Sequence, residues 1–130
     1  MVKMIIAVVA VFIAWSALDF VIHGVILQSA YASMPQLWRP MEEMKMGLMY
    51  FVTFLNAVIF TMIYSKFITQ KTLANALSFG IMYGLAAGLS MGYGTYSVQP
   101  IPYTMALTWF LGTLIEMAVA GVIVGLIIKE

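Results

Sequence analysis

Three ionisable side chains interrupt stretches that are otherwise apolar: Asp19, His23 and Glu116. Asp19 and His23 are four residues apart, a spacing that places both on one face of a helix. A charged side chain inside a bilayer costs on the order of 2.5–3.5 kcal/mol or more, so each of these residues requires a partner or a function. Carboxylates and histidine are also the groups that proton and cation paths use.

Two further polar residues, Asn56 and Tyr83, fall at a similar depth in their own apolar stretches. Counting about 1.5 Å per helical residue puts Asp19, Asn56, Tyr83 and Glu116 near mid-membrane, with His23 nearer the outer surface. We therefore expect an intramembrane polar cluster with one member of its central layer on each helix. It is either a set of hydrogen bonds that fixes the register of the bundle, or a path for protons or cations.

The composition around these residues excludes a soluble protein. Of 130 residues, 64% are hydrophobic and 8% are charged, whereas an average soluble domain is about 45–50% apolar and about 25% charged. A net charge of +1 gives no field that would attract nucleic acid. One histidine, no cysteine and no phosphate-binding or nucleophile motif argue against an enzyme. The chain is predicted to be an integral membrane protein with the lipid bilayer as its solvent.

Four apolar stretches are long enough to cross a bilayer, which takes about 20 helical residues. They cover approximately residues 4–27, 47–66, 73–93 and 103–128. We predict an all-α fold in which residues 1–130 form a single integral membrane domain, a four-transmembrane-helix bundle that runs up-down-up-down. Proline suits the first position of a helix, so we expect the second helix to begin near Pro40 and the fourth near Pro102.

The basic residues predict the orientation of this bundle. One side carries four of them, Lys3, Lys66, Lys71 and Lys129, and the other side carries two, Arg39 and Lys45. The excess of positive charge marks the cytoplasmic side, so both termini are expected in the cytoplasm. In the opposite loop, Trp38 and Arg39 suit the role of interface anchors, because an indole ring and a guanidinium group both favour the headgroup region.

Four glycines, Gly80, Gly84, Gly88 and Gly92, recur at every fourth position of the third stretch. At helical spacing they form one continuous groove, which allows another helix to pack closely. Such a glycine zipper serves either packing within the chain or contact with a second chain. It favours an accessory or structural subunit of a homo-oligomer or of a larger membrane complex.

Methionines gather in the first outer loop and the start of the second helix, including Met34, Met41 and Met44. Thioethers are soft ligands that select Cu(I), so copper handling is a further hypothesis, and Cu(I) is the one cofactor that the chain suggests. Methionine is equally a flexible apolar residue that fills irregular gaps.

Three segments carry a resemblance to known proteins. They read LDFVIHG at residues 18–24, LWRP at 37–40 and PIPY at 100–103. With these segments the chain resembles a group of small bacterial four-span integral membrane proteins with no assigned activity. The resemblance implies a location in the bacterial inner (plasma) membrane and implies nothing about chemistry.

Three functions are therefore open on the sequence. The favoured one is an accessory or structural subunit that packs through its glycine-rich helix. The second is a small oligomeric proton or cation transporter or channel that uses Asp19, His23 and Glu116. The third is a copper-handling membrane protein that uses the outer methionines.

Overall fold

Residues 1–129 are described in a computed structural model, and all regular structure within them is helical. Glu130 lies outside the described residues. Four helical segments are long and apolar enough to cross a membrane: Val2–Ile26, Met46–Phe67, Leu73–Val98 and Tyr103–Ile127. The prediction of an all-α chain with four helices of membrane-crossing length is confirmed, and it indicates a multi-pass membrane protein.

Two of the four segments contain a π-helical turn near one end. Helix α1 (Val2–Val21) continues into η1 (Ile22–Ile26), and α4 (Leu73–Gly88) continues into η4 (Leu89–Gly94) and then α5 (Thr95–Val98). The third segment thus runs beyond the expected end at residue 93, because the helix continues through the π-turn into α5. The other long helices are α3 (Met46–Phe67) and α6 (Tyr103–Ile127).

The expected start of the second long helix near Pro40 was wrong. Pro40 has an extended ψ of 153° and precedes only a 3-10 turn, η3 (Met41–Glu43). Met44 is again extended, which prevents that turn from joining α3, and the helix begins at Met46. The preceding loop holds two more short elements, α2 (Gln28–Ala32) and the 3-10 turn η2 (Pro35–Leu37). At the other end of the chain Pro102 directly precedes α6.

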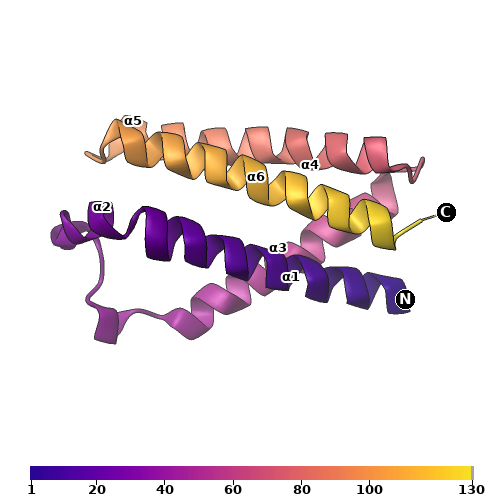
Figure 1. The fold of residues 1–130 in the computed structure, drawn as a ribbon, viewed down its shortest axis with the longest axis horizontal. Helices are drawn as coiled ribbons and strands as arrows, with labels where there is room; N and C mark the ends of the chain where they lie inside the picture. The colour runs from indigo at the N-terminus through magenta and orange to yellow at the C-terminus, as the bar shows by residue number, and fades with distance from the viewer. Residues whose placement is uncertain (130) are drawn as a thin grey trace.

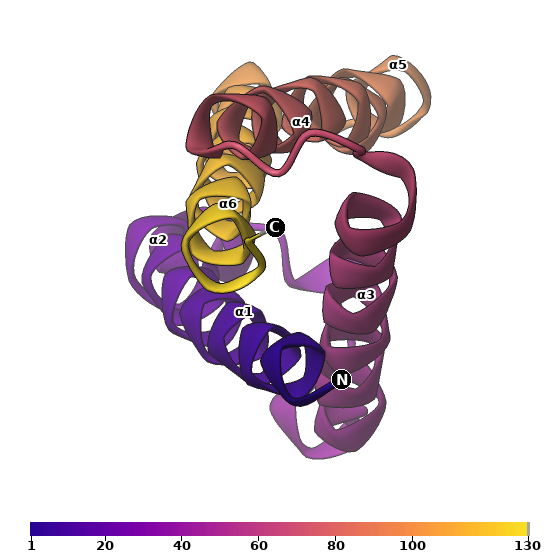
Figure 2. The same ribbon diagram turned by 90° about the vertical axis from the view of Figure 1, so that its right-hand side faces the viewer.

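The long helices form a curved row in the order α3, α1, α6, α4 (Figures 1 and 2). Helix α3 packs on α1, α1 packs on α6, and α6 packs most extensively on α4. The two helices at the ends of the row, α3 and α4, are joined through the turn at residues 68–72 and make few close backbone contacts. The start of α1 and the end of α6 lie at the same end of the molecule (Figure 1).

The four glycines that recur at every fourth position of α4 and η4 face α6 of the same chain. A Cβ atom on Gly80 would overlap the carbonyl oxygen of Met117, and one on Gly92 would lie 2.5 Å from that of Ala106. Gly84 and Gly88 are also confined, by Leu114 at 3.0 Å and Phe110 at 2.9 Å, respectively. The absence of side chains therefore lets two helix backbones approach, as expected for close packing in a bilayer. This is the packing within the chain that the sequence left as one alternative.

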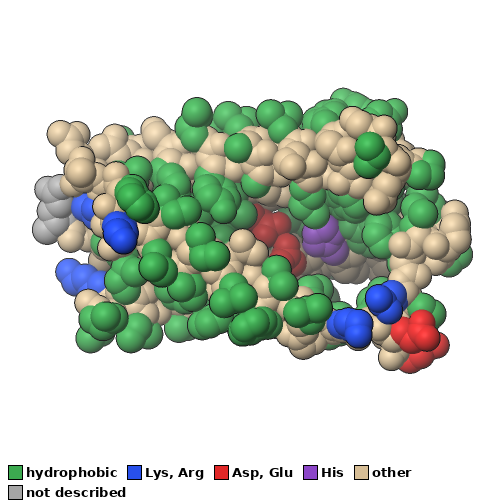
Figure 3. All heavy atoms as spheres, turned by 180° about the vertical axis from the view of Figure 1, so that it is seen from behind, with side chains coloured by type: hydrophobic (Ala, Val, Ile, Leu, Met, Phe, Trp, Pro, Cys, Tyr) green, Lys and Arg blue, Asp and Glu red, His purple; other side chains and the backbone are tan. Residues whose placement is uncertain are grey.

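Two apolar clusters hold the bundle together. The first, at the end with the termini, includes Val11, Phe60 and Val124, and the second, at the opposite end, includes Ile22, Met105 and Trp109. Asp19 on α1 and Glu116 on α6 lie between these clusters along their helices. Large apolar side chains also cover much of the outer surface, while lysine and arginine lie toward the two ends (Figure 3). This distribution suits a molecule surrounded by lipid.

Candidate functional site

A pocket of about 300 Å³ lies between the two apolar clusters, where all four long segments contribute side chains. Its lining consists of Trp15, Asp19, His23, Thr53, Asn56, Tyr83, Ala87, Met91, Thr113, Glu116 and Met117. All five polar residues singled out in the sequence thus line one pocket. On one face of the molecule, acidic side chains and the histidine are visible at the floor of a hollow (Figure 3).

The two carboxyl groups of the pocket are close neighbours from different helices. Asp19 of α1 and Glu116 of α6 line the same pocket and lie close enough for their charges to interact. Glu116 is 8% exposed, whereas the Asp19 side chain is 35% exposed. None of the lining residues is a lysine or an arginine. The pocket is therefore acidic, and the one base among its lining residues is His23, whose Nε2 lies 4.0 Å from Oδ1 of Asp19.

Two contacts hold the acids in place, one between α1 and α6 and one between η1 and α6. The indole nitrogen of Trp15 donates a hydrogen bond of 2.8 Å to the main-chain oxygen of Glu116. One turn before Glu116, Gly112 lies against Ile22, where a Cβ atom would come within 2.8 Å of the Ile22 side chain. The missing side chain lets the two helices approach at the level of the acids, and the indole fixes their relative height.

Beyond His23, a chain of hydrogen bonds leads out of the pocket to the loop. Nδ1 of His23 lies 2.6 Å from the hydroxyl of Tyr31 in α2, and Nε1 of Trp109 donates to that same hydroxyl at 2.7 Å. The rings of His23 and Tyr31 are stacked, with centroids 5.9 Å apart and planes 13° from parallel. The ring of Trp38 packs edge-on against Tyr31 at 4.9 Å.

The protonation of Tyr31 determines the direction of these hydrogen bonds. Burial raises the pKa of Tyr31 to about 12, an effect that the hydrogen bond from Trp109 partly opposes. The phenol is thus protonated at neutral pH, and its oxygen accepts from Trp109, because an indole nitrogen can only donate. The hydroxyl proton is then available to Nδ1 of His23, which leaves the other ring nitrogen of the neutral imidazole as the N–H that faces Asp19.

Asn56 and Tyr83 line the pocket but do not hydrogen-bond across the bundle as a register-fixing contact would require. The Asn56 amide donates to the carbonyl oxygen of Val52 in its own helix, at 3.0 Å. The Tyr83 ring packs on Phe60 and Phe79, with centroids 5.4 and 5.9 Å away. Both residues therefore supply polar groups to the pocket wall.

The remaining predicted positions lie away from the pocket. Trp38 belongs to the aromatic group around Tyr31, and Arg39 beside it is exposed. Met34 packs against the second apolar cluster, whereas Met41 is 76% exposed. Met44, in the extended segment before α3, is 39% exposed. Within residues 1–129 no group of three or more histidine or acidic side chains is arranged to hold a metal ion. Cu(I) binding by the methionines stays a prediction.

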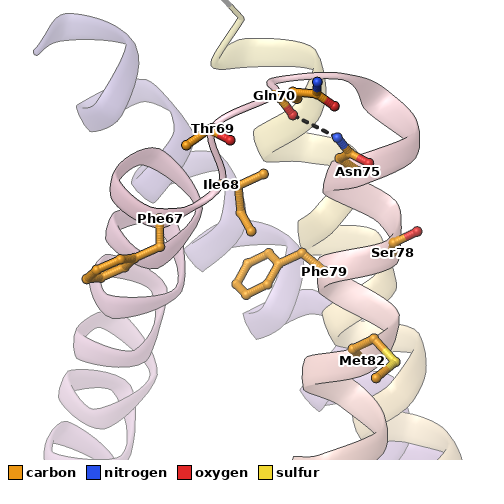
Figure 4. A pocket seen from close by; sticks show the side chains of 8 residues that line it. All are labelled: Phe67, Ile68, Thr69, Gln70, Asn75, Ser78, Phe79 and Met82. Carbon is orange, nitrogen blue, oxygen red and sulfur yellow. Dashed lines mark hydrogen bonds between the residues drawn. The ribbon is translucent and has the colours of Figure 1, made fainter.

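A second pocket, of about 390 Å³, lies at the turn between α3 and α4 (Figure 4). It is lined by Phe67, Ile68, Thr69, Gln70, Asn75, Ser78, Phe79 and Met82. Across it, the Asn75 amide donates to the carbonyl oxygen of Gln70, which ties the start of α4 to the turn (Figure 4). None of these lining residues is titratable, so this pocket is the weaker candidate for chemistry.

Sequence reasoning missed Tyr31 and Trp15 as parts of the site. Tyr31 follows His23 by eight residues, roughly two helical turns, and this spacing would have placed both on related faces had the first helix been expected to continue past residue 27. Trp15 lies one turn before Asp19, so the spacing of four that linked Asp19 to His23 also pointed to Trp15.

Comparison with known proteins adds no relative from which a function could be transferred. The chain matches no protein family, no curated protein and no solved structure.

Proposed function

We propose that this chain is a small membrane transporter that takes up a proton or another cation in the pocket between its long helices. The observation that carries the proposal is the position of two carboxyl groups, Asp19 and Glu116, in the lining of one pocket, in helical segments long enough to cross the bilayer. Two carboxylates this close repel each other, so a bound proton or cation stabilises the pair.

The hydrogen-bonded chain at the outer end supports a route for protons to the acids. A histidine can accept a proton at one ring nitrogen and release one from the other. His23 has Tyr31 at Nδ1 and Asp19 nearest Nε2, which is the arrangement that a relay needs. In this proposal Tyr31 positions the imidazole, and Asp19 and Glu116 receive the proton.

The glycines give less support to the structural subunit that the sequence favoured. Gly80, Gly84, Gly88 and Gly92 are covered by α6 of the same chain, so they leave no free groove for a second chain. A homo-oligomer or a larger complex would have to use another surface.

Orientation and location belong to the same proposal. With Lys3, Lys66, Lys71 and Lys129 toward the cytoplasm, the helices run up-down-up-down and both termini are cytoplasmic. The pocket then opens in the outer half of the membrane, and Tyr31 lies on its outer side. The resemblance of residues 18–24, 37–40 and 100–103 to small bacterial proteins supports the bacterial inner membrane.

Proton flux into proteoliposomes that contain a pH-sensitive dye tests this function. We expect the purified chain to speed the decay of an imposed pH gradient, and Glu116→Gln to abolish that effect, because an amide cannot carry the proton. Glu43→Gln, in an exposed outer turn, is the matched control and should keep the flux. Flux unchanged in Glu116→Gln would refute the proposal, and flux equal to that of empty liposomes would exclude the proton as the transported cation.

A further inference from the structure

We propose that the cation which the pocket binds is a small organic amine with an aromatic or aliphatic body, drawn from the surrounding bilayer. This inference rests on the proposed function and names its substrate class. Four observations support it: the charge of the pocket, its volume, its walls and the side on which it opens.

The charge of the pocket selects a cation and rejects an anion. Asp19 and Glu116 line the same pocket, and no lysine or arginine lines it to compensate them. Glu116 is more than nine-tenths buried, so its carboxyl group has little access to water that would screen it. A positive group placed between these acids removes their repulsion and gains attraction to both.

The volume of the pocket exceeds what an inorganic ion fills. About 300 Å³ is available, whereas one water molecule occupies about 30 Å³ of liquid. Pockets that bind small organic molecules begin at about this size and are mostly apolar, with a few polar groups that orient the ligand. The pocket thus has room for an ammonium group together with an attached ring or short chain.

The walls match such a ligand. Two aromatic rings, Trp15 and Tyr83, line the pocket next to the acids. Aromatic faces attract ammonium groups, and quaternary ammonium ligands are recognised in this way. Ala87, Met91 and Met117 supply apolar surface, and thioether side chains adapt to ligands of different shapes.

The opening of the pocket faces the bilayer. The hollow that exposes the acids lies on a long side of the molecule, flanked by hydrophobic side chains, and not at either end (Figure 3). It is bounded by α3 and α4, which make few close backbone contacts with each other. An amine with an apolar body partitions into lipid, and from there its ammonium group can reach Asp19 and Glu116 without crossing the apolar clusters.

Binding of benzyltrimethylammonium to the full chain in a neutral detergent tests the inference. We expect isothermal titration calorimetry to show saturable binding at one site, and no binding of phenylmethanesulfonate, an anion of similar size. Glu116→Gln should weaken binding at least about tenfold through the lost charge, and Ala87→Leu should weaken it by filling the pocket. Glu42→Gln, in the exposed outer turn, should bind as the unchanged protein does.

Ala87→Leu also guards against a folding artefact, because it keeps both acids in place while it narrows the pocket. Circular dichroism of each variant establishes that its helices are intact before binding is compared. Binding that is equal in the unchanged protein, Glu116→Gln and Ala87→Leu would overturn the inference, as would competition by sodium at the concentration of the amine.

The failure of this inference and the failure of the proposed function give different results. If benzyltrimethylammonium does not bind while proton flux depends on Glu116, the pocket serves protons or inorganic cations and the organic substrate is wrong. If proton flux also fails to depend on Glu116, the transport function itself is wrong.

Discussion

The two faces of α4 that meet other long helices differ sharply in how closely the backbones approach. Against α6, the glycines allow contact so close that a methyl group at Gly80 would overlap a carbonyl oxygen. Toward α3, helix α4 presents Phe79 and Tyr83, and its backbone stays apart from that of α3. Helix α4 therefore packs tightly on α6, because the glycines have no side chains, whereas Phe79 and Tyr83 keep its backbone away from α3. We call the surface of α4 that contacts α6 the sealed side and the surface toward α3 the open side.

This difference separates the rigid part of the molecule from the part that can admit a ligand. In lipid, helices associate through van der Waals packing, so a glycine interface has many contacts to lose when it opens. The contact between α3 and α4 depends on a few aromatic rings, and both pockets lie along it. We therefore expect movement of α3 relative to α4, and little movement between α4 and α6.

The largest effect should come from adding one methyl group to the sealed side. Gly80→Ala places a carbon against the main-chain oxygen of Met117, which cannot rotate away, so α4 and α6 must separate. We expect a loss of about 3 kcal/mol in unfolding free energy, at the upper end for overpacked sites. Unfolding by sodium dodecyl sulfate, followed by circular dichroism, measures it.

Gly47→Ala is the matched control for that substitution. A Cβ atom at Gly47 in α3 would meet nothing within 4 Å, so the same chemical change should leave stability unchanged or slightly raised. Equal losses in Gly80→Ala and Gly47→Ala would show that the glycine interface has no special importance.

The access of a thiol reagent should differ between the pocket on the open side and the buried interior of the bundle. We expect this effect to be smaller than that of Gly80→Ala. The chain has no cysteine, so single thiols can be introduced without background. We expect a thiol in Thr113→Cys, which lines the pocket, to react with 2-aminoethyl methanethiosulfonate at least about tenfold faster than one in Ala120→Cys, which is fully buried in the same helix. Similar rates at both positions would mean that the pocket is closed to reagents.

The smallest effect should come from Tyr31, whose hydroxyl lies next to His23 at one end of the pocket. Tyr31→Phe removes the hydroxyl that joins His23 to Trp109, and we expect a loss of about 1 kcal/mol in unfolding free energy at neutral pH. Because the pKa of Tyr31 is raised from 10.0 to about 12 in the folded chain, the folded state holds this proton more tightly than the unfolded state does.

The contribution of Tyr31 is thus complete below pH 10 and is lost as the pH rises toward 12. Unfolding measured across that range should show a fall in stability that Tyr31→Phe lacks. A parallel fall in both proteins would indicate that Tyr31 titrates as a free phenol, and that the loop does not hold it against His23.

Apolar length and helical spacing predicted much of this molecule, because both depend on residues close together in the chain. The four spans follow from runs of apolar residues, and the four glycines from their interval of four. Counting depth from the ends of the stretches put Asn56 and Glu116 in one layer, and in the structure both line one pocket. The depth of a residue along its helix does not say toward which neighbouring helix its side chain points. The wide separation of α3 and α4 was therefore not predicted.

The loop between the first two long helices could not be predicted in the same way. Pro40 suits a helix start by its own geometry, but the extended backbone at Pro40 and Met44 delays the helix to Met46. The position of Tyr31 over His23 depends on the π-turn at the end of α1, which apolar periodicity does not reveal. Tertiary packing, and not local preference, decides both features.

The π-turns η1 and η4 also make the chain sensitive to insertions and deletions at two points. Such a turn holds one residue more than an α-helical turn, so deletion of one residue within Ile22–Ile26 can restore a regular helix without breaking it. Everything after the deletion would rotate by about 100° relative to α1, and Tyr31 would leave the imidazole. The number of residues in this turn therefore sets which loop side chain closes the outer end of the pocket.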